Sequence, residues 1–212
     1  MSVPEKIWLF RMVHWQNVEH ILRHGLCCRE HPLADPNYIN IGHNQLITDR
    51  HDYPIPLEGA GNLGEYVPFY FAGHSPMLYA IMNGYLGVQR RPQYDIVFVV
   101  SSFEKIQSSG LEFVFTDRNA KKAIANYYNQ VVDFNKIDWA AVKSKVWENT
   151  IDYLDRKELK QAEFLARNHV PAHCIEMLVV KTNERKEYFE KIMRSLGLGI
   201  PVRVDNLQKL YY

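Results

Sequence analysis

The sequence predicts an α+β fold with a mostly antiparallel sheet, organised as one domain over residues 1–212. Apolar runs of strand length and segments with helical spacing follow one another without the regular strand and helix alternation of a parallel sheet. The 212 residues suffice for one well-filled core and are too few for two generous domains. Hydrophobic residues make up 47% and charged residues 23%, which is ordinary globular usage and excludes a disordered chain.

The first unit is expected to be a strand followed by a helix. Residues 7–13 form an apolar run, interrupted by one arginine, that ends at His14. From Asn17 onward apolar residues recur at helical spacing, and Gly25 stands where a helix ends. His14 is therefore expected at the junction between strand and helix.

Residues 26–65 are expected to form a long loop. No strong period survives in this stretch, and four prolines punctuate it. Only residues 47–50 suggest a short helical turn. A loop this long inside a small domain is usually functional or disordered.

The segment GAGNLG, residues 59–64, matches the G-x-G-x-x-G pattern of dinucleotide-binding loops. That fingerprint requires a strand before it and a helix after it. Here two prolines precede it, and the aromatic and β-branched residues 66–71 that follow predict a strand. We therefore reject a Rossmann site and expect a flexible connection or a hairpin turn.

Capping residues and apolar runs predict the remaining elements. Ser75-Pro76 supplies the N-cap and first-turn residues of a helix that runs toward Gly84. Strands are expected at residues 96–100, 112–116, 161–165, 175–180 and, as a brief pairing, 201–204. A helix capped by Asp117 or Asn119 is expected in the segment with Ala120, Ala123 and Ala125. Another is expected after Asp138, in the segment with Trp139 and Val142. A last helix is expected over residues 184–196, ended by Gly197 and Gly199.

The expected strand QAEFL, residues 161–165, carries one carboxylate among core-forming residues. Side chains alternate along a strand, so Ala162 and Phe164 should point one way, and Glu163 and Leu165 the other. A carboxylate that packing restrains and partly desolvates suits a group that stabilises positive charge at one spot. The alternative, which the pentapeptide alone favours, is a glutamate on the wet face of an edge strand.

Charge and cysteine content narrow the possible partners and the compartment. The net charge of +1 provides no global attraction to nucleic acid or to an anionic membrane, so a polyanion would be held by a local patch. Cys27, Cys28 and Cys174 form a poor disulfide framework, which indicates a reduced, cytoplasmic protein. Residues 1–6 lead into no apolar leader, and no apolar run approaches a membrane span, so we expect neither export nor insertion.

Three arrangements of histidine or cysteine residues could suggest a metal site, a nucleophile or a ribonuclease site, but each has a simpler structural explanation. His20 and His24 have the spacing of a metal pair, but without HExxH or CxxC motifs we expect solvated histidines and no metal. Cys174 is expected in the core rather than as a nucleophile. Arg167 and His173 loosely fit the R-x4-6-H spacing of HEPN-type toxin ribonucleases, although the proline between them disfavours the helix that such a site needs.

Four blocks of sequence resemble a known family. "MVHWQNVEHILRHG", "YVPFYFAGHSPMLY", "FVFTDRNA" and "QAEFL" occur in this order between residues 12 and 165. They resemble the DarT family of DNA ADP-ribosyltransferases, the toxins of DarTG toxin–antitoxin systems. The resemblance implies an ADP-ribosyltransferase-like fold, with a split, mostly antiparallel sheet and surrounding helices around an NAD cleft. It also implies transfer of ADP-ribose from NAD, the substrate, to a base in single-stranded DNA, with thymine favoured, and a macrodomain antitoxin of the DarG kind as partner.

The resemblance also assigns roles to individual residues. Glu163 matches the catalytic glutamate, and Arg50 lies where the family has an essential arginine. The implied NAD-binding residues are His14, Asn17, Gly25, Arg50, Tyr70 and Phe71. The implied DNA-binding residues are Met77, Asn119, where the family often has histidine, Lys157 and Lys160.

General chemistry is compatible with these roles. Breaking the bond between nicotinamide and ribose creates an oxocarbenium-like centre, which a carboxylate that holds the ribose 2-hydroxyl stabilises more than the ground state. A guanidinium such as that of Arg50 suits a pyrophosphate or an anionic base better than lysine. Aromatic rings can hold an unstacked base without a large charge. Three hypotheses remain: this transferase, expected as a monomer; a ribonuclease centred on Arg167 and His173; and a non-catalytic NAD-binding or DNA-binding module.

Overall fold

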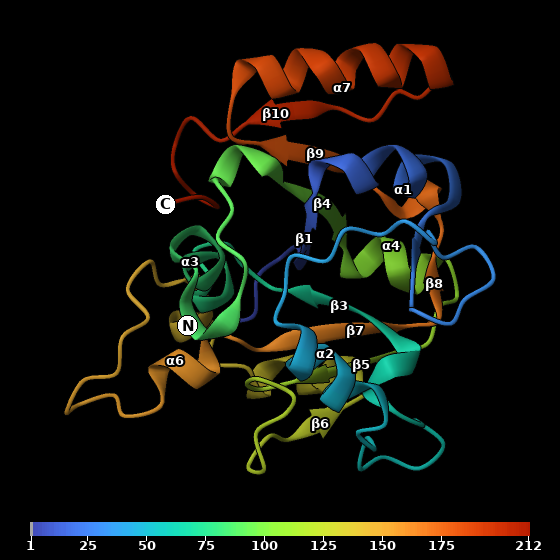
Figure 1. Ribbon diagram of the computed structural model, residues 1–212. Helices are drawn as coiled ribbons and strands as arrows, with labels where there is room; N and C mark the ends of the chain where they lie inside the picture. The colour runs from blue at the N-terminus through green and yellow to red at the C-terminus, as the bar shows by residue number, and fades with distance from the viewer. Residues whose placement is uncertain (1) are drawn as a thin grey trace.

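A computed structural model describes residues 2–212 and has an eight-stranded sheet at its centre (Figure 1). The strand order is β10-β9-β4-β1-β3-β7-β5-β6, and every neighbouring pair is antiparallel except β9 and β10. The strands are β1 (Trp8–His14), β3 (Tyr66–Tyr70), β4 (Ile96–Ser102), β5 (Phe113–Thr116), β6 (Tyr127–Tyr128), β7 (Glu163–Arg167), β9 (Met177–Val180) and β10 (Val202–Val204). This confirms the predicted α+β fold with a mostly antiparallel sheet.

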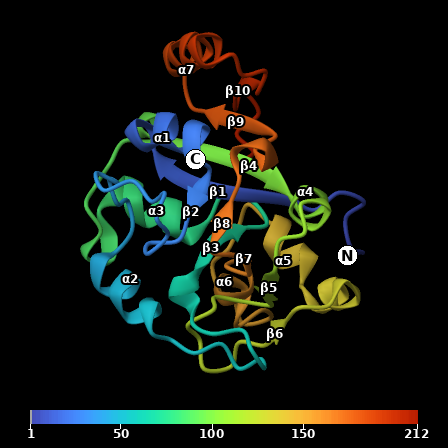
Figure 2. The same cartoon turned by 90° about the vertical axis from the view of Figure 1, so that its right-hand side faces the viewer.

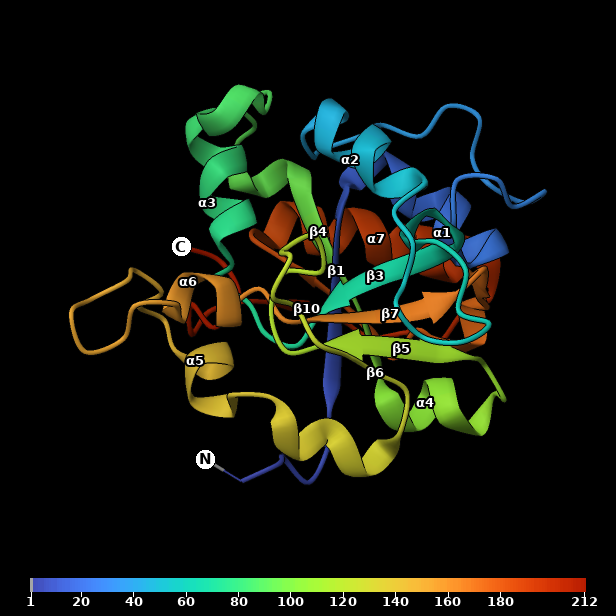
Figure 3. The same cartoon turned by 90° about the horizontal axis from the view of Figure 1, so that it is seen from below.

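The sheet is split between β1 and β3. These two strands share a single residue pair, Phe10 with Tyr70, whereas β1 pairs with β4 along its whole length and β3 with β7 along theirs. Figure 3 shows β3, β7 and β5 running across the direction of β1. The two halves therefore meet at Tyr70, which places this residue at the centre of the fold.

Seven helices surround the sheet in the described part of the chain. They are α1 (Val18–His24), α2 (Asn44–His51), α3 (Pro76–Asn83), α4 (Phe103–Ser108), α5 (Trp139–Lys143), α6 (Arg156–Leu159) and α7 (Asn183–Leu196). The helix α7 stands beside β9 and β10 at one end of the molecule, away from α2 (Figure 2). No helix within residues 2–212 is long and apolar enough to cross a membrane.

Local capping chemistry explains the helices that were predicted. The Ser75 hydroxyl accepts a hydrogen bond from the backbone N–H of Leu78, and Gly84 ends α3 with a φ of 71°. Asp138 caps α5 in the same way by accepting from Ala140 and Ala141. Residues that can adopt these cap conformations thus set both ends of α3 and the start of α5.

Three expectations about loops need correction or extension. The predicted alanine-rich helix is wrong: the Asp117 carboxylate instead accepts from the backbone N–H of Asn126 at 3.0 Å and its side-chain amide at 2.8 Å, which closes residues 117–126 into a loop before β6. The short turn expected at residues 47–50 belongs to the longer helix α2. The long loop also contains β2 (Leu26–Cys27), which pairs with β8 (His169–Val170).

The glycine-rich segment forms no dinucleotide-binding loop. Asn62 caps a 3₁₀ turn over Leu63–Glu65, and this turn leads directly into β3. A helix does not follow the glycines, so the rejection of a Rossmann site is confirmed.

Candidate active site

His14, Tyr70 and Glu163 lie on one face of the sheet. Tyr70 pairs with Phe10 in β1 and with Glu163 in β7, and directly paired residues project to the same side. Residues 10, 12 and 14 of β1 share that side because side chains alternate along a strand. Ala162, Phe164 and Ala166 belong to the core on the other side, as predicted. Glu163 is only 2% exposed and β7 lies between β3 and β5, so the alternative of a wet edge-strand glutamate is wrong.

Arg50, near the C-terminal end of α2, holds both oxygens of the Glu163 carboxylate. Nη1 donates to Oε1 at 3.0 Å and Nη2 donates to Oε2 at 2.7 Å. Burial alone would lower the pKa of Arg50, but the charge and hydrogen bonds of Glu163 raise this pKa above its usual value. The guanidinium therefore stays charged, and the bidentate pair fixes the orientation of the carboxylate.

The loop formed by residues 117–126 completes the surroundings of Glu163. The backbone N–H of Ala120 donates to Oε1 of Glu163 at 3.0 Å. The Thr116 hydroxyl accepts from the backbone N–H of Glu163 at 3.2 Å. Lys121 ties the same loop to α2, since its ammonium donates to the Asp49 carbonyl at 3.3 Å. Strand, loop and helix thus converge on a single carboxylate.

Two tyrosines flank the carboxylate. The Tyr70 hydroxyl donates to the sulfur of Met77 at 3.5 Å, and the Tyr127 hydroxyl donates to the carbonyl of Ala120. Burial and the nearby charge of Glu163 raise the pKa of Tyr70, and burial raises the pKa of Tyr127. Both phenols are therefore neutral near pH 7 and can donate hydrogen bonds.

The Ala120 N–H and Tyr127 are not among the residues that the sequence predicts for the site. Ala120 is expected inside a helix, where its N–H would be used within the helix itself. The adjacent aromatic residues Tyr127 and Tyr128 were the available signal, because paired aromatics favour a strand over a helix end.

His14 and Asn17 lie at the junction of β1 and α1. His14 is 4% exposed, and burial together with the charge of Arg91 lowers the pKa of its imidazole. The Asn17 amide donates to the carbonyl of Ile39 and accepts from its N–H, both at 2.9 Å. These two bonds fasten the long loop to the end of the strand that carries His14.

Two predicted ligand contacts lie in the interior instead. The Phe71 ring packs edge-on against Trp139 and Phe164, with centroid separations of 5.4 and 6.2 Å, so it is not available to stack on a nicotinamide ring. Lys160 is 4% exposed and its ammonium donates to the Val142 carbonyl at 2.6 Å, which corrects the expectation of a DNA contact.

Gly25 ends α1 where that helix approaches β8. Its φ is 84°, and a Cβ at this position would lie 2.3 Å from the carbonyl oxygen of Val170. Close packing of backbone on backbone thus explains this glycine. Its role in binding NAD stays a prediction.

The other predicted DNA contacts lie near the carboxylate or on the surface. Met77 is half-buried beside Tyr70, and Asn119 immediately precedes Ala120. Lys157 is exposed on α6, with its ammonium 5.5 Å from the centre of the Trp147 ring. Contacts of these three side chains with DNA stay predictions.

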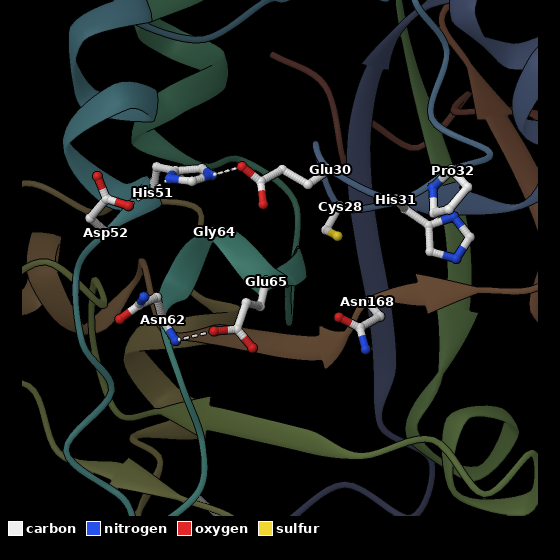
Figure 4. A pocket seen from close by; sticks show the side chains of 10 residues that line it. All are labelled: Cys28, Glu30, His31, Pro32, His51, Asp52, Asn62, Gly64, Glu65 and Asn168. Atoms are coloured by element: carbon white, nitrogen blue, oxygen red, sulfur yellow. Dashed lines mark hydrogen bonds and ion pairs between the residues drawn. The ribbon is translucent and has the colours of Figure 1, made fainter.

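An open pocket of about 560 Å³ lies beside the C-terminal end of α2, and none of the predicted site residues lines it (Figure 4). Most of the residues that line it have polar side chains, among them Glu30 and His51, whose Nε2 lies 2.9 Å from Oε1 of Glu30. Among residues 2–212, no group of three or more histidine, cysteine, aspartate or glutamate side chains could hold a metal ion.

The two residues of the alternative ribonuclease site lie on different elements. Arg167 ends β7 and pairs with Glu65 and Glu112, whereas His173 lies in the 3₁₀ turn Ala172–Cys174. No helix contains both Arg167 and His173, which removes the geometry that the ribonuclease hypothesis needs. Cys174 is fully buried, as predicted.

A split antiparallel sheet that presents a histidine, a tyrosine and a buried glutamate on one face defines an ADP-ribosyltransferase-like protein. A family model described as "ssDNA thymidine ADP-ribosyltransferase, DarT" matches residues 10–212. The chain belongs to the DarT family. This membership confirms the prediction of an NAD-dependent DNA ADP-ribosyltransferase.

Relatives in two organisms agree with this assignment. A DNA ADP-ribosyl transferase of Escherichia coli O127:H6 is 34% identical over 202 residues, covering 94% of this chain and 93% of the relative. The structure of Thermus sp. 2.9 DarT in complex with ADP-ribosylated ssDNA matches with a TM-score of 0.89 and 30% identity, covering 100% of this chain and 99% of the other. The same Thermus protein in complex with NAD+ matches with a TM-score of 0.84 and 30% identity over the whole of both chains.

Proposed function

We propose that this chain transfers ADP-ribose from NAD to a thymine base of single-stranded DNA, with Glu163 as the catalytic residue. The observation that carries the proposal is the Glu163 carboxylate, buried on the same sheet face as His14 and Tyr70 and held by Arg50. The family description and the Thermus complexes with NAD+ and with ADP-ribosylated ssDNA support the choice of substrates.

Glu163 acts on the sugar. Its carboxylate accepts a hydrogen bond from the ribose 2-hydroxyl. It also stabilises the positive charge that grows on the ribose ring as nicotinamide leaves. The donors Arg50 and Ala120 keep the carboxylate oriented before the substrate arrives, so little reorganisation is needed during the reaction. A neutral Tyr70 beside it can offer its ring and hydroxyl to the nicotinamide.

NAD and the DNA strand are bound by different elements. His14 and Asn17, at the end of β1, hold the ribose and the amide of NAD, and the loop fastened by Asn17 covers the ligand. Met77, Asn119 and the exposed Lys157 contact the DNA strand. The near-neutral net charge of the chain suits a short stretch of DNA held by local contacts.

In the cell we propose a toxin that acts as a monomer, with residues 1–212 forming one domain. Resemblance to DarTG systems supports a macrodomain antitoxin as its partner. The free cysteines Cys27, Cys28 and Cys174 support action in the reducing cytoplasm.

Mass spectrometry of oligonucleotides tests this proposal. Incubation with NAD should add one ADP-ribose to single strands that contain thymine and none to strands without it, and Glu163→Gln should abolish the addition. Absence of any adduct on every sequence would refute the proposal.

Two other outcomes would point to the other hypotheses. Cleavage of RNA without NAD that is lost in His173→Ala would favour the ribonuclease. Protection by NAD against thermal unfolding, without release of nicotinamide, would favour a non-catalytic module.

A further inference from the structure

Helix α2 carries Arg50 without being embedded in the core. None of its residues belongs to the hydrophobic core, and residues 44–49 are all exposed. At eight residues, α2 is also too short to be stable alone in water. Contacts near its ends must therefore fix this helix, and with it the position from which Arg50 reaches the Glu163 carboxylate.

The last turn of α2 rests on Gly64, the middle residue of the 3₁₀ turn Leu63–Glu65 (Figure 4). A Cβ at Gly64 would lie 2.6 Å from the carbonyl oxygen of His51 and 2.9 Å from both its Cα and its Cδ2. The φ of Gly64 lies outside the left-handed region, so space rather than backbone conformation excludes a side chain. Rotating the His51 side chain could not make room, because two of these three atoms belong to the backbone. This contact gives the last glycine of the segment 59–64 a role that the Rossmann interpretation did not supply.

The turn Leu63–Glu65 is fixed to the strand that carries Glu163. Oε1 of Glu65 accepts from the backbone N–H of Asn62 at 2.8 Å, and Oε2 accepts from Nη2 of Arg167 at 3.1 Å. Arg167 is the last residue of β7 and Glu163 is the first. A helix end that rests on this turn is therefore held relative to the catalytic carboxylate.

The ion pairs at the same helix end are exposed. The His51 imidazole lies 2.9 Å from a carboxylate oxygen of Glu30 and 2.8 Å from one of Asp52, but these two acidic side chains are 75% and 89% exposed. Exposed ion pairs contribute little to stability. Close packing against Gly64, rather than these ion pairs, sets how near α2 approaches the turn.

We propose that Gly64 is a positioning residue for the transfer reaction. Its missing side chain lets the last turn of α2 approach the turn before β3, and this approach places Arg50 against the Glu163 carboxylate. A larger residue would displace the backbone of His51, the neighbour of Arg50, and the bidentate contact depends on that position. This inference rests on the proposed function and adds to it the residue that places the cation beside the catalytic carboxylate.

Kinetics of Gly64→Ala test this role. The kcat and the KM for NAD are measured with a thymine-containing single strand. Gly64→Ala should lower kcat by about 10-fold to 100-fold with KM nearly unchanged, because the carboxylate that Arg50 orients acts in the transition state. The matched control is Gly199→Ala, which should behave like the wild type. Gly199 is exposed, its φ also lies outside the left-handed region, and a Cβ there would meet no atom within 4 Å.

A second background separates positioning of Arg50 from general loosening of the site. Arg50→Lys keeps the positive charge but cannot make the bidentate contact, so it removes what Gly64 secures. Adding Gly64→Ala to Arg50→Lys should change kcat by about twofold or less, which is the usual error of additivity. General loosening would instead lower kcat by the same factor in both backgrounds. That result, or an unchanged kcat in a folded Gly64→Ala protein, would overturn the inference.

If Gly64→Ala does not fold, Glu65→Ala decides. It frees the same turn from Arg167 and adds no bulk. Glu65→Ala should lower kcat in the wild-type background and leave it nearly unchanged in the Arg50→Lys background. An unchanged kcat in the wild-type background, or equal losses in the two backgrounds, would overturn the inference.

The wild type separates this inference from the proposed function. A wild-type protein that does not modify DNA in the presence of NAD would refute both. An active wild type with a folded, fully active Gly64→Ala variant would refute the role of Gly64 alone.

Discussion

Replacing Lys160 by methionine tests whether the charged amine of this lysine is buried. Lys160 lies three residues before Glu163 in the sequence. Lys160 is 4% exposed, and its ammonium donates to the Val142 carbonyl. Burial lowers the pKa of this amine from 10.5 to about 8. Methionine keeps the length of the apolar stem and removes the charge, so Lys160→Met isolates the cost of burying the ammonium.

The magnitude follows from the difference between the folded and unfolded pKa values of Lys160. One pKa unit corresponds to about 1.4 kcal/mol, so a fall from 10.5 to about 8 amounts to about 3 kcal/mol. Below pH 8 both states carry the proton, and the folded state bears the full cost of burying it. Between pH 8 and 10.5 the unfolded state binds the proton that the folded state has lost, so stability rises with pH, and above 10.5 the cost is gone.

Urea unfolding at pH 7 and at pH 10.5 measures this effect. The stability of Lys160→Met relative to the wild type should fall by about 3 kcal/mol between the two pH values. The tyrosines also titrate in this pH range, but they contribute equally to the free energy of unfolding of both proteins. Their contribution therefore cancels in the difference between variant and wild type. Lys157→Met, at an exposed lysine, is the matched control and should show no such change. An equal stability difference between Lys160→Met and the wild type at both pH values would refute a buried, perturbed amine.

Two further substitutions test the loop and the helix that close over the site. Arg50→Gln leaves the buried Glu163 carboxylate without its cation and should cost about 3 kcal/mol in urea unfolding, and adding Glu163→Gln should restore most of this loss. Additive losses in that double-mutant cycle would contradict a direct pair. Asn17→Ala removes both bonds to Ile39 and should raise KM for NAD several-fold with kcat nearly unchanged, while Asn37→Ala, at an exposed residue of the same loop, should have no effect. An unchanged KM in Asn17→Ala would show that the loop does not depend on that clamp.

Local sequence signals predicted the elements whose chemistry is local. Ser75 and Gly84 predicted both ends of α3, and the apolar run at residues 96–100 predicted the fully buried strand β4. The alternation around Glu163 predicted which residues face the core. In each case the deciding interactions lie within a few residues of one another along the chain.

Long-range contacts explain the failures. The alanine-rich segment has helical propensity, but the hydrogen bonds from the Asn126 N–H to Asp117 and from the Ala120 N–H to Glu163 hold it as a loop. Lys160 looked like a surface cation within a run of charge, yet the turn of α6 directs it inward toward α5. The sequence alone predicts neither the loop nor the buried lysine, because the strand and the helix that supply their hydrogen-bond partners lie far away along the chain.

The sequence predicted only part of the site, because some of its contacts also join residues far apart along the chain. The resemblance pointed to Glu163, Arg50 and Tyr70, and the structure brings these three together. It did not distinguish Tyr70 from Phe71, although neighbouring residues of an extended segment point to opposite sides. Contacts with backbone groups, such as the Ala120 N–H, carry no side-chain signature and could not be read from a motif.

The most direct measurement of the central claim is the rate of nicotinamide release by Glu163→Gln, compared with its affinity for NAD. Glutamine keeps the shape of the side chain and removes the negative charge that stabilises the ribose cation. We predict a fall in kcat of about 100-fold to 1000-fold or more, with NAD still protecting the variant against thermal unfolding. Release at the wild-type rate by a folded Glu163→Gln protein would contradict the assignment of Glu163 as the catalytic residue.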